Sequence, residues 1–373
     1  MYSGNTPSRL NKEHFKGTVN WISSGELKEH YIYSSKEQIS EEAAKSLKLL
    51  PVGTFVIAIY GLEAEGVRGT GSITQEPSTI SQACMSFIPK GVIENEFLYS
   101  WYKKHGNVIG IRYAQGTKQQ NLSYDILEKF RIAYPNTKEQ EKLNKFISLL
   151  DERIATQSKI IDKLQSLIKG LNDSLYELYG NGITTSFAEL GHSYSGLSGK
   201  TANDFGTGKP FITYLNVYSN NIINENDYQY VRISEGEKQN VVKYGDVLFT
   251  LSSETPEEVG VGSVFLGKEE VLLNSFCFGI HIENEEQVYS PYLSYYVSST
   301  PFRKFIYPFA QGITRFNLCK ADFEKASIKL PLLENQKHIY AILNSIAEKI
   351  ETEEMMLEKY LIQKQYLLRQ MFI

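Results

Sequence analysis

Apolar residues recur at steps of three, four and seven positions over two long stretches, 138–179 and 334–372. Neither stretch contains proline, and Gly180 and Gly182 follow the first one. This pattern predicts two amphipathic helices with coiled-coil character. The apolar positions are Leu143, Phe146, Ile147, Leu150, Ile154, Ile161, Leu164, Leu167, Ile168, Leu171, Leu175 and Leu178 in the first stretch, and Ile339, Leu343, Ile346, Ile350, Leu357, Leu361, Leu368 and Met371 in the second.

Each predicted helix would be about 60 Å long at 1.5 Å per residue, which is more than one small domain can cover. An apolar stripe of that length needs a partner of equal length. The sequence therefore predicts an antiparallel pair of helices with a globular part at each end, a dumbbell with pseudo-two-fold symmetry. The alternative is that each helix folds back on its own globular part. The stripe is broader than a two-strand seam, which leaves room for helices from another protein.

The segments before the two helices predict short strands separated by loops. Residues 52–60 and 245–251 are rich in β-branched and aromatic residues and follow a glycine, so both are predicted strands. EKFRIAYP (128–135) and EKASIKLP (324–331) each predict a strand that ends at proline. Loops rich in Gly, Asn and Ser separate these segments. The fold class expected for the globular parts is α+β, with two similar α/β domains.

The chain also repeats itself. Residues 113–140 align with 309–336 without a gap at an offset of 196, and upstream PVGTFVIAIYG (51–61) is similar to KYGDVLFTLSS (243–253). The duplication predicts globular domains at 1–137 and 181–333 and helices at 138–180 and 334–373. The identical pairs are Ala114/Ala310, Gln115/Gln311, Gly116/Gly312, Asn121/Asn317, Leu122/Leu318, Glu128/Glu324, Lys129/Lys325, Ile132/Ile328, Pro135/Pro331 and Gln140/Gln336.

Composition excludes several classes of protein. Hydrophobic residues make up 42% and charged residues 22% of 373 residues, which is typical of globular chains and not of disordered ones. Cys84, Cys277 and Cys319 form no CxxC pair, so a zinc site or a disulfide framework is not expected and a reducing cytoplasm fits. No apolar run of 18 residues and no signal-peptide pattern occurs, so neither a membrane span nor export is expected.

Catalytic motifs are missing from the sequence. It contains no GxxxxGK[ST] phosphate loop and no Asn-Pro-Pro-aromatic or Asp-Pro-Pro-Tyr string of the kind that adenine methyltransferases use. The six histidines lack the spacing of metal ligands, and the paired acids of SETPEE (253–258) are more typical of a solvated loop than of a metal site. We therefore predict no catalytic residue, no metal site and no cofactor in this chain.

The order of these motifs resembles the specificity subunits of type I restriction–modification enzymes over essentially the whole chain. The resemblance depends on the AQG…NL…EK…I..P…Q block before each helix, on GNTPSRLNKEHFKGTVNWISSGELKE (4–29) and on PFITYLNVYSNN (210–221). It implies two target-recognition domains that read the halves of a split sequence in double-stranded DNA. It also implies that the helices act as a spacer.

The same resemblance implies partner proteins. Methyltransferase subunits would dock on the helices, bind S-adenosylmethionine and methylate adenine. Restriction subunits would join the complex and use ATP and Mg²⁺ to cut DNA. Family members usually carry extra residues before the first recognition domain, as TTSFAEL (184–190) does here before the second. No such residues precede the first, so we expect either a shortened chain or a first domain without one edge strand.

DNA recognition needs cations for phosphates and polar side chains for base edges. The segments GTKQQN (116–121) and GITRFN (312–317) supply both kinds after a glycine, at equivalent places in the two copies. Two further patches contain cations, aromatic residues and short polar side chains. The predicted DNA-binding residues are Thr117, Lys118, Gln119, Gln120, Thr314 and Arg315 in those segments, and Arg9, Lys12, Trp21, Ser23, Ser24, Lys200, Lys209, Tyr214, Asn216 and Tyr218 in the patches.

The identical residues Gln115/Gln311 and Asn121/Asn317 have a second interpretation, because they can simply stabilise turns. Net charge also opposes the DNA interpretation, since 39 Lys and Arg face 43 Asp and Glu. Two arrangements would reconcile this charge with DNA binding: the acids gather on the helices, as 351–360 suggests, or the methyltransferase subunits clamp the duplex. We expect weak, salt-sensitive binding by the chain alone and tight, specific binding in a complex. The remaining alternatives are a coiled-coil scaffold that binds proteins, and a nuclease or methyltransferase with an unrecognised site.

Overall fold

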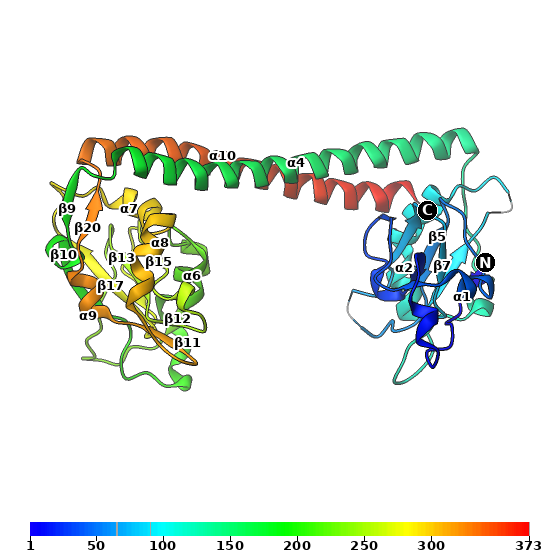
Figure 1. Ribbon diagram of the computed structural model, residues 1–373, viewed down its shortest axis with the longest axis horizontal. Helices are drawn as coiled ribbons and strands as arrows, with labels where there is room; N and C mark the ends of the chain where they lie inside the picture. Colours follow the sequence, from blue (N-terminus) through cyan, green and yellow to red (C-terminus); the bar gives the residue numbers. More distant parts are fainter. Residues whose placement is uncertain (65, 90, 373) are drawn as a thin grey trace. The chain divides into compact units, whose positions relative to one another are not determined.

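The protein, described by a computed structural model for residues 1–64, 66–89 and 91–372, divides into two compact units (Figure 1). Unit 1 contains residues 1–158 together with 355 onward, and unit 2 contains residues 159–354. Helices α4 (Thr137–Tyr179) and α10 (Leu333–Met371) each contribute to both units. Each unit therefore consists of one globular part and a section of both long helices.

Unit 1 is built on a sheet with the strand order β1-β8-β5-β6-β3 and a smaller sheet with the order β4-β2-β7. The strands of the first sheet are Tyr2–Ser3, Cys84–Phe87, Phe55–Ala58, Gly71–Thr74 and Tyr31–Ile32, and those of the second are Gln38–Ile39, Val19–Ile22 and Ser78–Ile80. The helices are α1 (Glu41–Lys45), α2 (Asn95–Tyr113) and α3 (Tyr124–Leu127), with short 3-10 turns η1 (Lys12–Phe15) and η2 (Ser24–Glu26).

Unit 2 has a sheet with the order β10-β17-β13-β15 and smaller sheets β12-β11-β16, β14-β19-β18 and β20-β9. In those orders the strands are Gly191–Ser195, Cys277–Ile282, Val247–Thr250 and Gly262–Val264; Gln229–Val231, Phe205–Ile212 and Leu272–Leu273; Ser252–Ser253, Phe316–Leu318 and Ala310–Gly312; and Ile328–Leu330 and Ile183–Thr185. The helices are α5 (Phe187–Leu190), α6 (Tyr214–Ser219), α7 (Ser290–Tyr296), α8 (Thr300–Ile306) and α9 (Lys320–Lys325), with 3-10 turns η3 (Ala202–Asp204), η4 (Glu225–Asp227), η5 (Pro256–Glu258) and η6 (Tyr307–Phe309).

The two globular parts share one hydrogen-bonded frame, as the duplication predicts. Strand β5 lies between β8 and β6, just as β13 lies between β17 and β15. The Gly4 N–H donates to the Cys84 carbonyl at 3.1 Å, and the Gly196 N–H donates to the Cys277 carbonyl at 3.2 Å. A second matched pair joins the sheet to the segment before each long helix: Leu122 N to Ile59 O at 2.9 Å, and Leu318 N to Leu251 O at 2.8 Å.

The long helices lie side by side in opposite directions within unit 1. Lys364 of α10 forms an ion pair with Asp151 of α4, and the Arg153 guanidinium lies 4.8 Å from the centre of the Tyr360 ring. Near the globular part, both helices reach the same hydrophobic core, because Ile147 of α4 is buried in it and Leu368 and Met371 of α10 pack against it. The coiled-coil spacing of the apolar residues thus creates an antiparallel pair in this unit.

In unit 2 the start of α10 takes the place that the start of α4 has in unit 1. The beginning of α10 buries Ile339 and Leu343 in the core, whereas the end of α4 packs Leu171 and Leu175 against it. The core fills the space between strands β13 and β17 and helices α7 and α8, with Phe249 and Phe302 among its fully buried rings. Each globular part therefore packs on the start of one long helix and the end of the other, so neither helix packs on its own globular part alone.

A buried glutamine fixes each long helix to its globular part. Gln140 is fully buried; its amide donates to the carbonyls of Val92 and Pro135, both at 2.8 Å, and accepts from the Glu94 N–H at 2.9 Å. Gln336 in the other copy is also fully buried and makes the same three bonds, to the carbonyls of Gln287 and Pro331 and from the Tyr289 N–H. The identity of Gln140 and Gln336 therefore has a structural cause.

We expect the substitution Gln336→Ala to destabilise unit 2 by about 3 kcal/mol, because it leaves one buried N–H and two buried carbonyls without their partner. Denaturant unfolding monitored by tyrosine fluorescence measures this loss. Gln363→Ala, at an exposed position of α10, is the matched control and should change the stability by less than about 0.5 kcal/mol. Equal stabilities of the two variants would contradict the role of Gln336.

Not every predicted strand forms. Residues 52–60 and 245–251 contain β5 and β13, as expected, and 324–331 contains β20. The strand predicted at 128–135 is wrong, because no residue from 130 to 136 is assigned to a strand. A strand forms only where another strand pairs with it. Strand β20 pairs with β9, and no described part of unit 1 supplies a counterpart of β9.

No helix in the described part of the chain is both long enough and apolar enough to cross a membrane.

Candidate nucleic-acid interface

A hairpin before the last segment of each globular part positions the tip residues predicted from the repeat. In unit 2, β18 pairs with β19, with Gln311 opposite Asn317. In unit 1, Gln115 and Asn121 exchange backbone hydrogen bonds of 2.8 and 2.9 Å. All four identical residues thus lie at the base of a hairpin, which supports their second interpretation as turn-stabilising residues.

Glycine is required at the first turn position of both hairpins. Gly116 has φ +117° and Gly312 has φ +148°, in the region that side chains rarely adopt. A Cβ at either position would also lie 2.0 Å from a carbonyl oxygen of the same tip, that of Gln119 or Arg315. The two hairpins therefore share a backbone and differ in the side chains that they expose.

Those differing side chains are mostly free at the surface. Thr117, Lys118 and Gln119 are exposed in unit 1, and Thr314 and Arg315 are exposed in unit 2. Gln120 is partly buried: its N–H donates to the Glu63 carboxylate at 2.8 Å, and its side-chain oxygen accepts from Arg68 at 3.4 Å. The hairpin tips thus offer a cation and hydroxyl or amide groups on a fixed backbone, which is the chemistry that contacts phosphates and base edges.

In unit 2 the structure brings α6 next to this hairpin. The Tyr214 hydroxyl donates to the carbonyl of Ser252 at 2.9 Å, and Ser252 pairs with Asn317 of β19. Burial raises the pKa of the Tyr214 hydroxyl, and the positive charge of nearby Arg315 opposes that shift. Tyr214 and Arg315, predicted in separate segments, therefore belong to one surface.

Two other predicted residues of α6 are engaged within the unit. The Tyr218 hydroxyl donates to the Glu258 carboxylate at 2.8 Å, and its ring stacks 6.0 Å from that of Tyr214. Asn216 is 3% exposed, and it donates to the Asn224 carbonyl at 2.8 Å and accepts from the Asn224 N–H at 3.0 Å. Asn216 is therefore a loop-stabilising residue, whereas Tyr218 remains at the edge of the surface.

The two predicted lysines of unit 2 differ in their surroundings. Lys209 is exposed on β11, whereas the Lys200 side chain is only 7% exposed and lies 2.6 Å from the Glu237 carboxylate. Hydrogen bonds from Lys200, Ser234 and Gln239 lower the pKa of Glu237 to about 2. Lys200 is thus held in an ion pair, and Lys209 is the cation that is free to meet a ligand.

The lowered pKa of Glu237 predicts an acid-sensitive part of the stability. Since the folded-state pKa lies below the ordinary value of 4.5, this contribution is present above about pH 4.5 and is lost as the pH falls toward about 2. We expect Glu237→Gln to reduce the drop in the urea midpoint of unit 2 between about pH 6 and pH 3. An identical drop in the wild type and the variant would contradict it.

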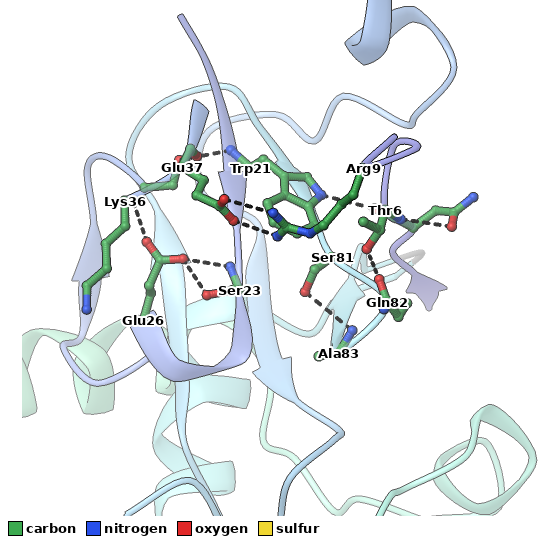
Figure 2. Close-up of polar contacts among 12 residues, drawn as sticks. Thr6, Arg9, Trp21, Ser23, Glu26, Lys36, Glu37, Ser81, Gln82 and Ala83 are labelled. Carbon is green, nitrogen blue, oxygen red and sulfur yellow. Dashed lines mark hydrogen bonds and ion pairs between the residues drawn. The ribbon is translucent and has the colours of Figure 1, made fainter. Parts of the chain in front are cut away.

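In unit 1, Arg9 and Trp21 of the first predicted patch make contacts with other residues of the same unit (Figure 2). The Arg9 guanidinium donates twice to the Glu37 carboxylate, at 3.0 and 2.7 Å, and lies 4.6 Å from the centre of the Phe15 ring. Trp21 is 4% exposed, and its indole N–H donates to the Asn5 carbonyl at 3.0 Å. Trp21 is therefore a core residue of unit 1 and is not part of the exposed surface.

The remaining residues of this patch lie in η1 and at the start of η2. The Ser23 hydroxyl donates to the Glu26 carboxylate at 2.6 Å and so begins η2 (Figure 2). Ser24, the first residue of η2, is partly buried, and Lys12 is exposed in η1. Ser23 follows β2 as Thr213 follows β11, so the patch of unit 1 and α6 of unit 2 lie at equivalent ends of their strands.

Sequence reasoning missed the turns before β8 and β17. The Ile59 N–H donates to the Ala83 carbonyl at 2.9 Å, and the Leu251 N–H donates to the Phe276 carbonyl at 2.9 Å, so each turn adjoins its hairpin. Gln82 accepts from the Thr6 hydroxyl (Figure 2), and Phe276 is 57% exposed. The sequence repeat could have indicated these turns, because they occupy matching places before β8 and β17 and their residues differ between the two copies.

We call the combined surface of each unit its recognition face. Each face consists of the hairpin tip, the turn before β8 or β17 and the loop after β2 or β11. The exposed or partly exposed members include Ser23, Ser24, Gln82, Thr117, Lys118, Gln119 and Gln120 in unit 1, and Tyr214, Tyr218, Phe276, Thr314 and Arg315 in unit 2, whereas the exposed predicted cations Arg9, Lys12 and Lys209 lie outside these segments. Across the described residues, no group of three His, Cys, Asp or Glu side chains has the arrangement of a metal site.

The acidic residues do not gather on the helices, so the first of the two arrangements that would reconcile the net charge with DNA binding is not found. Residues 138–180 contain equal numbers of acidic and basic residues, and 334–373 has a single acidic residue in excess. Residues 1–137 are slightly basic, whereas 181–333 carry the acidic excess of the chain. Any binding of phosphates by unit 2 would therefore depend on the local cations of its surface.

Two similar modules, each with the same frame and a different exposed surface, define a protein built by duplication. The family model for the type I restriction modification DNA specificity domain matches residues 2–166 and again residues 196–359. These two matches cover most of the chain, and each includes one recognition face. The chain belongs to the family of type I restriction modification DNA specificity proteins.

Individual relatives agree with this assignment. The chain is 30% identical over 170 residues to the type I restriction enzyme MjaIX specificity subunit of Methanocaldococcus jannaschii, covering 43% of this chain and 38% of the relative. It is 30% identical over 183 residues to the EcoR124I/EcoR124II specificity subunit of Escherichia coli, covering 48% of this chain and 44% of the relative. The matched part thus spans less than half the length of these curated relatives.

One solved structure shares the fold over the whole chain. The type I restriction–modification system S subunit from M. genitalium is 14% identical, with a TM-score of 0.51, and the match covers 100% of this chain and 93% of that one. At this identity the likeness concerns the fold alone. It is consistent with the two repeated α/β parts described above.

Proposed function

We propose that this chain is the DNA specificity subunit of a type I restriction–modification complex, in which each unit reads one half of a split target. The observation that carries the proposal is the repeated frame with differing faces. Gln115 and Gln311 hold matched hairpins, but the tips present Lys118 in one unit and Arg315 in the other. A constant frame with different exposed side chains is what reading two different half-sites requires.

In this proposal the long helices set the distance between the half-sites. Both α4 and α10 run without a break from one unit into the other, and they pair in opposite directions in unit 1. We infer that the pair continues as a spacer between the two globular parts, in a dumbbell with pseudo-two-fold symmetry. The globular parts would then contact DNA at two places separated by a fixed gap.

The helices also retain apolar surface that a partner can cover. Leu149 is 55% exposed on α4, and Leu361 and Ile362 are 45% and 58% exposed on α10, all in unit 1; Leu167 is 51% exposed in unit 2. Large exposed aliphatic side chains along a helix favour packing with further helices. We therefore assign these surfaces to methyltransferase subunits, with the restriction subunits joining through the complex.

The chemistry of the complex would belong to its partners. The methyltransferase subunits would bind S-adenosylmethionine and methylate adenine, and the restriction subunits would use ATP and Mg²⁺. The role of this chain would be to position the DNA without a cofactor of its own. Because the chain has more acidic than basic residues, we expect weak, salt-sensitive DNA binding by the chain alone and tight binding in the complex.

Methylome mapping tests the proposal directly. A host that expresses this chain with its methyltransferase should gain adenine methylation at one motif made of two short halves separated by a fixed number of unspecified bases. A host that expresses the methyltransferase alone should not. The proposal fails if the assembled complex binds cognate and random DNA with equal affinity.

A further inference from the structure

Three large apolar side chains are exposed on the recognition face of unit 2. Ile313 is 93% exposed at the hairpin tip, Leu215 is 68% exposed on α6, and Phe276 is 57% exposed in the turn before β17. Single exposed apolar residues are common on protein surfaces, whereas several on one surface are typical of a binding site. Each of the three segments of this face therefore contributes an apolar side chain in addition to its polar and charged ones.

Hydrogen bonds hold the three segments of this face next to one another. The Leu251 N–H donates to the Phe276 carbonyl at 2.9 Å, and the Leu251 carbonyl accepts from the Leu318 N–H of β19 at 2.8 Å. The Tyr214 hydroxyl of α6 donates to the carbonyl of Ser252 at 2.9 Å. The two residues at 251 and 252 thus connect the hairpin, the turn before β17 and α6.

Unit 1 has small or polar residues at the same three positions. The aligned pairs are Ile313/Thr117, Phe276/Ala83 and Leu215/Gly25. The repeat aligns the first pair without a gap, and matching bonds from the N–H groups of Ile59 and Leu251 align the second. Matching bonds to the carbonyls of Ile22 and Ile212, each three residues earlier, align the third. Since the frame is the same in both units, it does not require these apolar side chains.

Double-stranded DNA offers a specific partner for such side chains. In the major groove, thymine presents its C5-methyl group, which apolar side chains contact, whereas guanine presents acceptors to arginine. The hairpin tip of unit 2 carries both kinds of side chain, because Ile313 lies two residues before Arg315. The match to the DNA specificity domain, residues 196–359, also contains all three apolar residues. These observations favour DNA over a protein as the partner of this surface.

We propose that unit 2 reads thymine methyl groups in its half-site through Ile313, Phe276 and Leu215. This inference rests on the function proposed above and names the chemistry that one half-site must have. That half should specify at least one A·T pair besides the pair that contains the methylated adenine. Each methyl group that is removed from water in such a contact strengthens binding about fourfold.

Replacement of thymine by deoxyuridine tests the inference, because it removes the methyl group and keeps the hydrogen-bonding edge of the base. The test uses the complex with the methyltransferase subunits and duplexes that carry deoxyuridine in one half of the target at a time. We expect binding to weaken about fourfold for each contacted thymine in one half, and to change by less than about twofold in the other.

The possible results separate this inference from the function on which it rests. If neither half is sensitive to deoxyuridine while the complex still prefers its cognate site to random DNA, the inference is wrong and the proposed function stands. If the complex shows no such preference, the proposed function fails as well. A half-site pair with no A·T pair beyond those that contain the methylated adenines would also contradict the inference.

Variants of the exposed apolar residues assign the effect to unit 2. Ile313→Ser should lower the ratio of the affinities for thymine and deoxyuridine duplexes from about four to about one. Leu332→Ser changes a leucine of unit 2 that is 55% exposed outside the face, so it should leave this ratio unchanged. A ratio that stays at about four in both Ile313→Ser and Phe276→Ala would overturn the proposal. Loss of methyltransferase subunits from these variants without a change in the ratio would indicate a protein contact and would overturn it too.

Discussion

In the assembled complex, Arg315→Ala should weaken binding to the cognate site about 10- to 100-fold and relax the sequence requirement in one half-site only. Arg315 is exposed at the tip of the β18–β19 hairpin, on a backbone fixed by Gly312 and by the pairing of Gln311 with Asn317. An arginine held in this way can make a bidentate contact to guanine, and such a contact discriminates by about 1–3 kcal/mol. Competition binding with duplexes altered in either half measures both effects.

The control for this experiment is Lys325→Ala, which removes an exposed cation of α9 outside the recognition face and should leave the affinity within about twofold. Salt dependence separates the two kinds of contact. If Arg315 met only a phosphate, its loss would lower affinity equally for all sequences and reduce the slope of log affinity against log salt by about one. Relaxation of both half-sites would contradict the assignment of one half-site to unit 2.

Much of the frame could be predicted from the sequence because its signals are local or repeated. The apolar spacing indicated both long helices, and the β-branched residues after Gly53 and Gly245 indicated β5 and β13. The repeat also separated constant from variable positions. Gln140 and Gln336 are identical because each makes the same three buried hydrogen bonds, which no local pattern reveals.

The failures concern features that depend on a distant partner. Residues 128–135 have the composition of a strand, but a strand forms only where another pairs with it, as β9 does with β20. The surroundings of two predicted surface cations also depend on distant residues: Arg9 and Lys200 form ion pairs with Glu37 and Glu237, which lie 28 and 37 residues away. The burial of Trp21 could not be predicted from the sequence either, because it depends on the loop that contains Asn5.

Insertion of seven residues into each long helix should change the target without changing either half of it. The insertions would follow Ser158 in α4 and Glu354 in α10, where the chain passes from one compact unit to the other. A heptad preserves the phase of the apolar stripe and adds about 10 Å to each helix. If the helices form the spacer that we propose, the gap between half-sites should widen by about three base pairs, since one base pair rises about 3.4 Å.

This prediction has the largest expected effect, because methylation of the original site should be lost while a new motif with the same two halves appears. Methylome mapping of hosts that express the wild type and the elongated chain with the same methyltransferase gives both results at once. A heptad inserted into α4 alone breaks the match between the helices, so it should abolish methylation at either spacing. If the paired insertion altered the bases of a half-site, the helices would contribute to base reading. If it left the gap unchanged, they would not determine the spacing, and the distance between the half-sites would depend on the partner subunits instead.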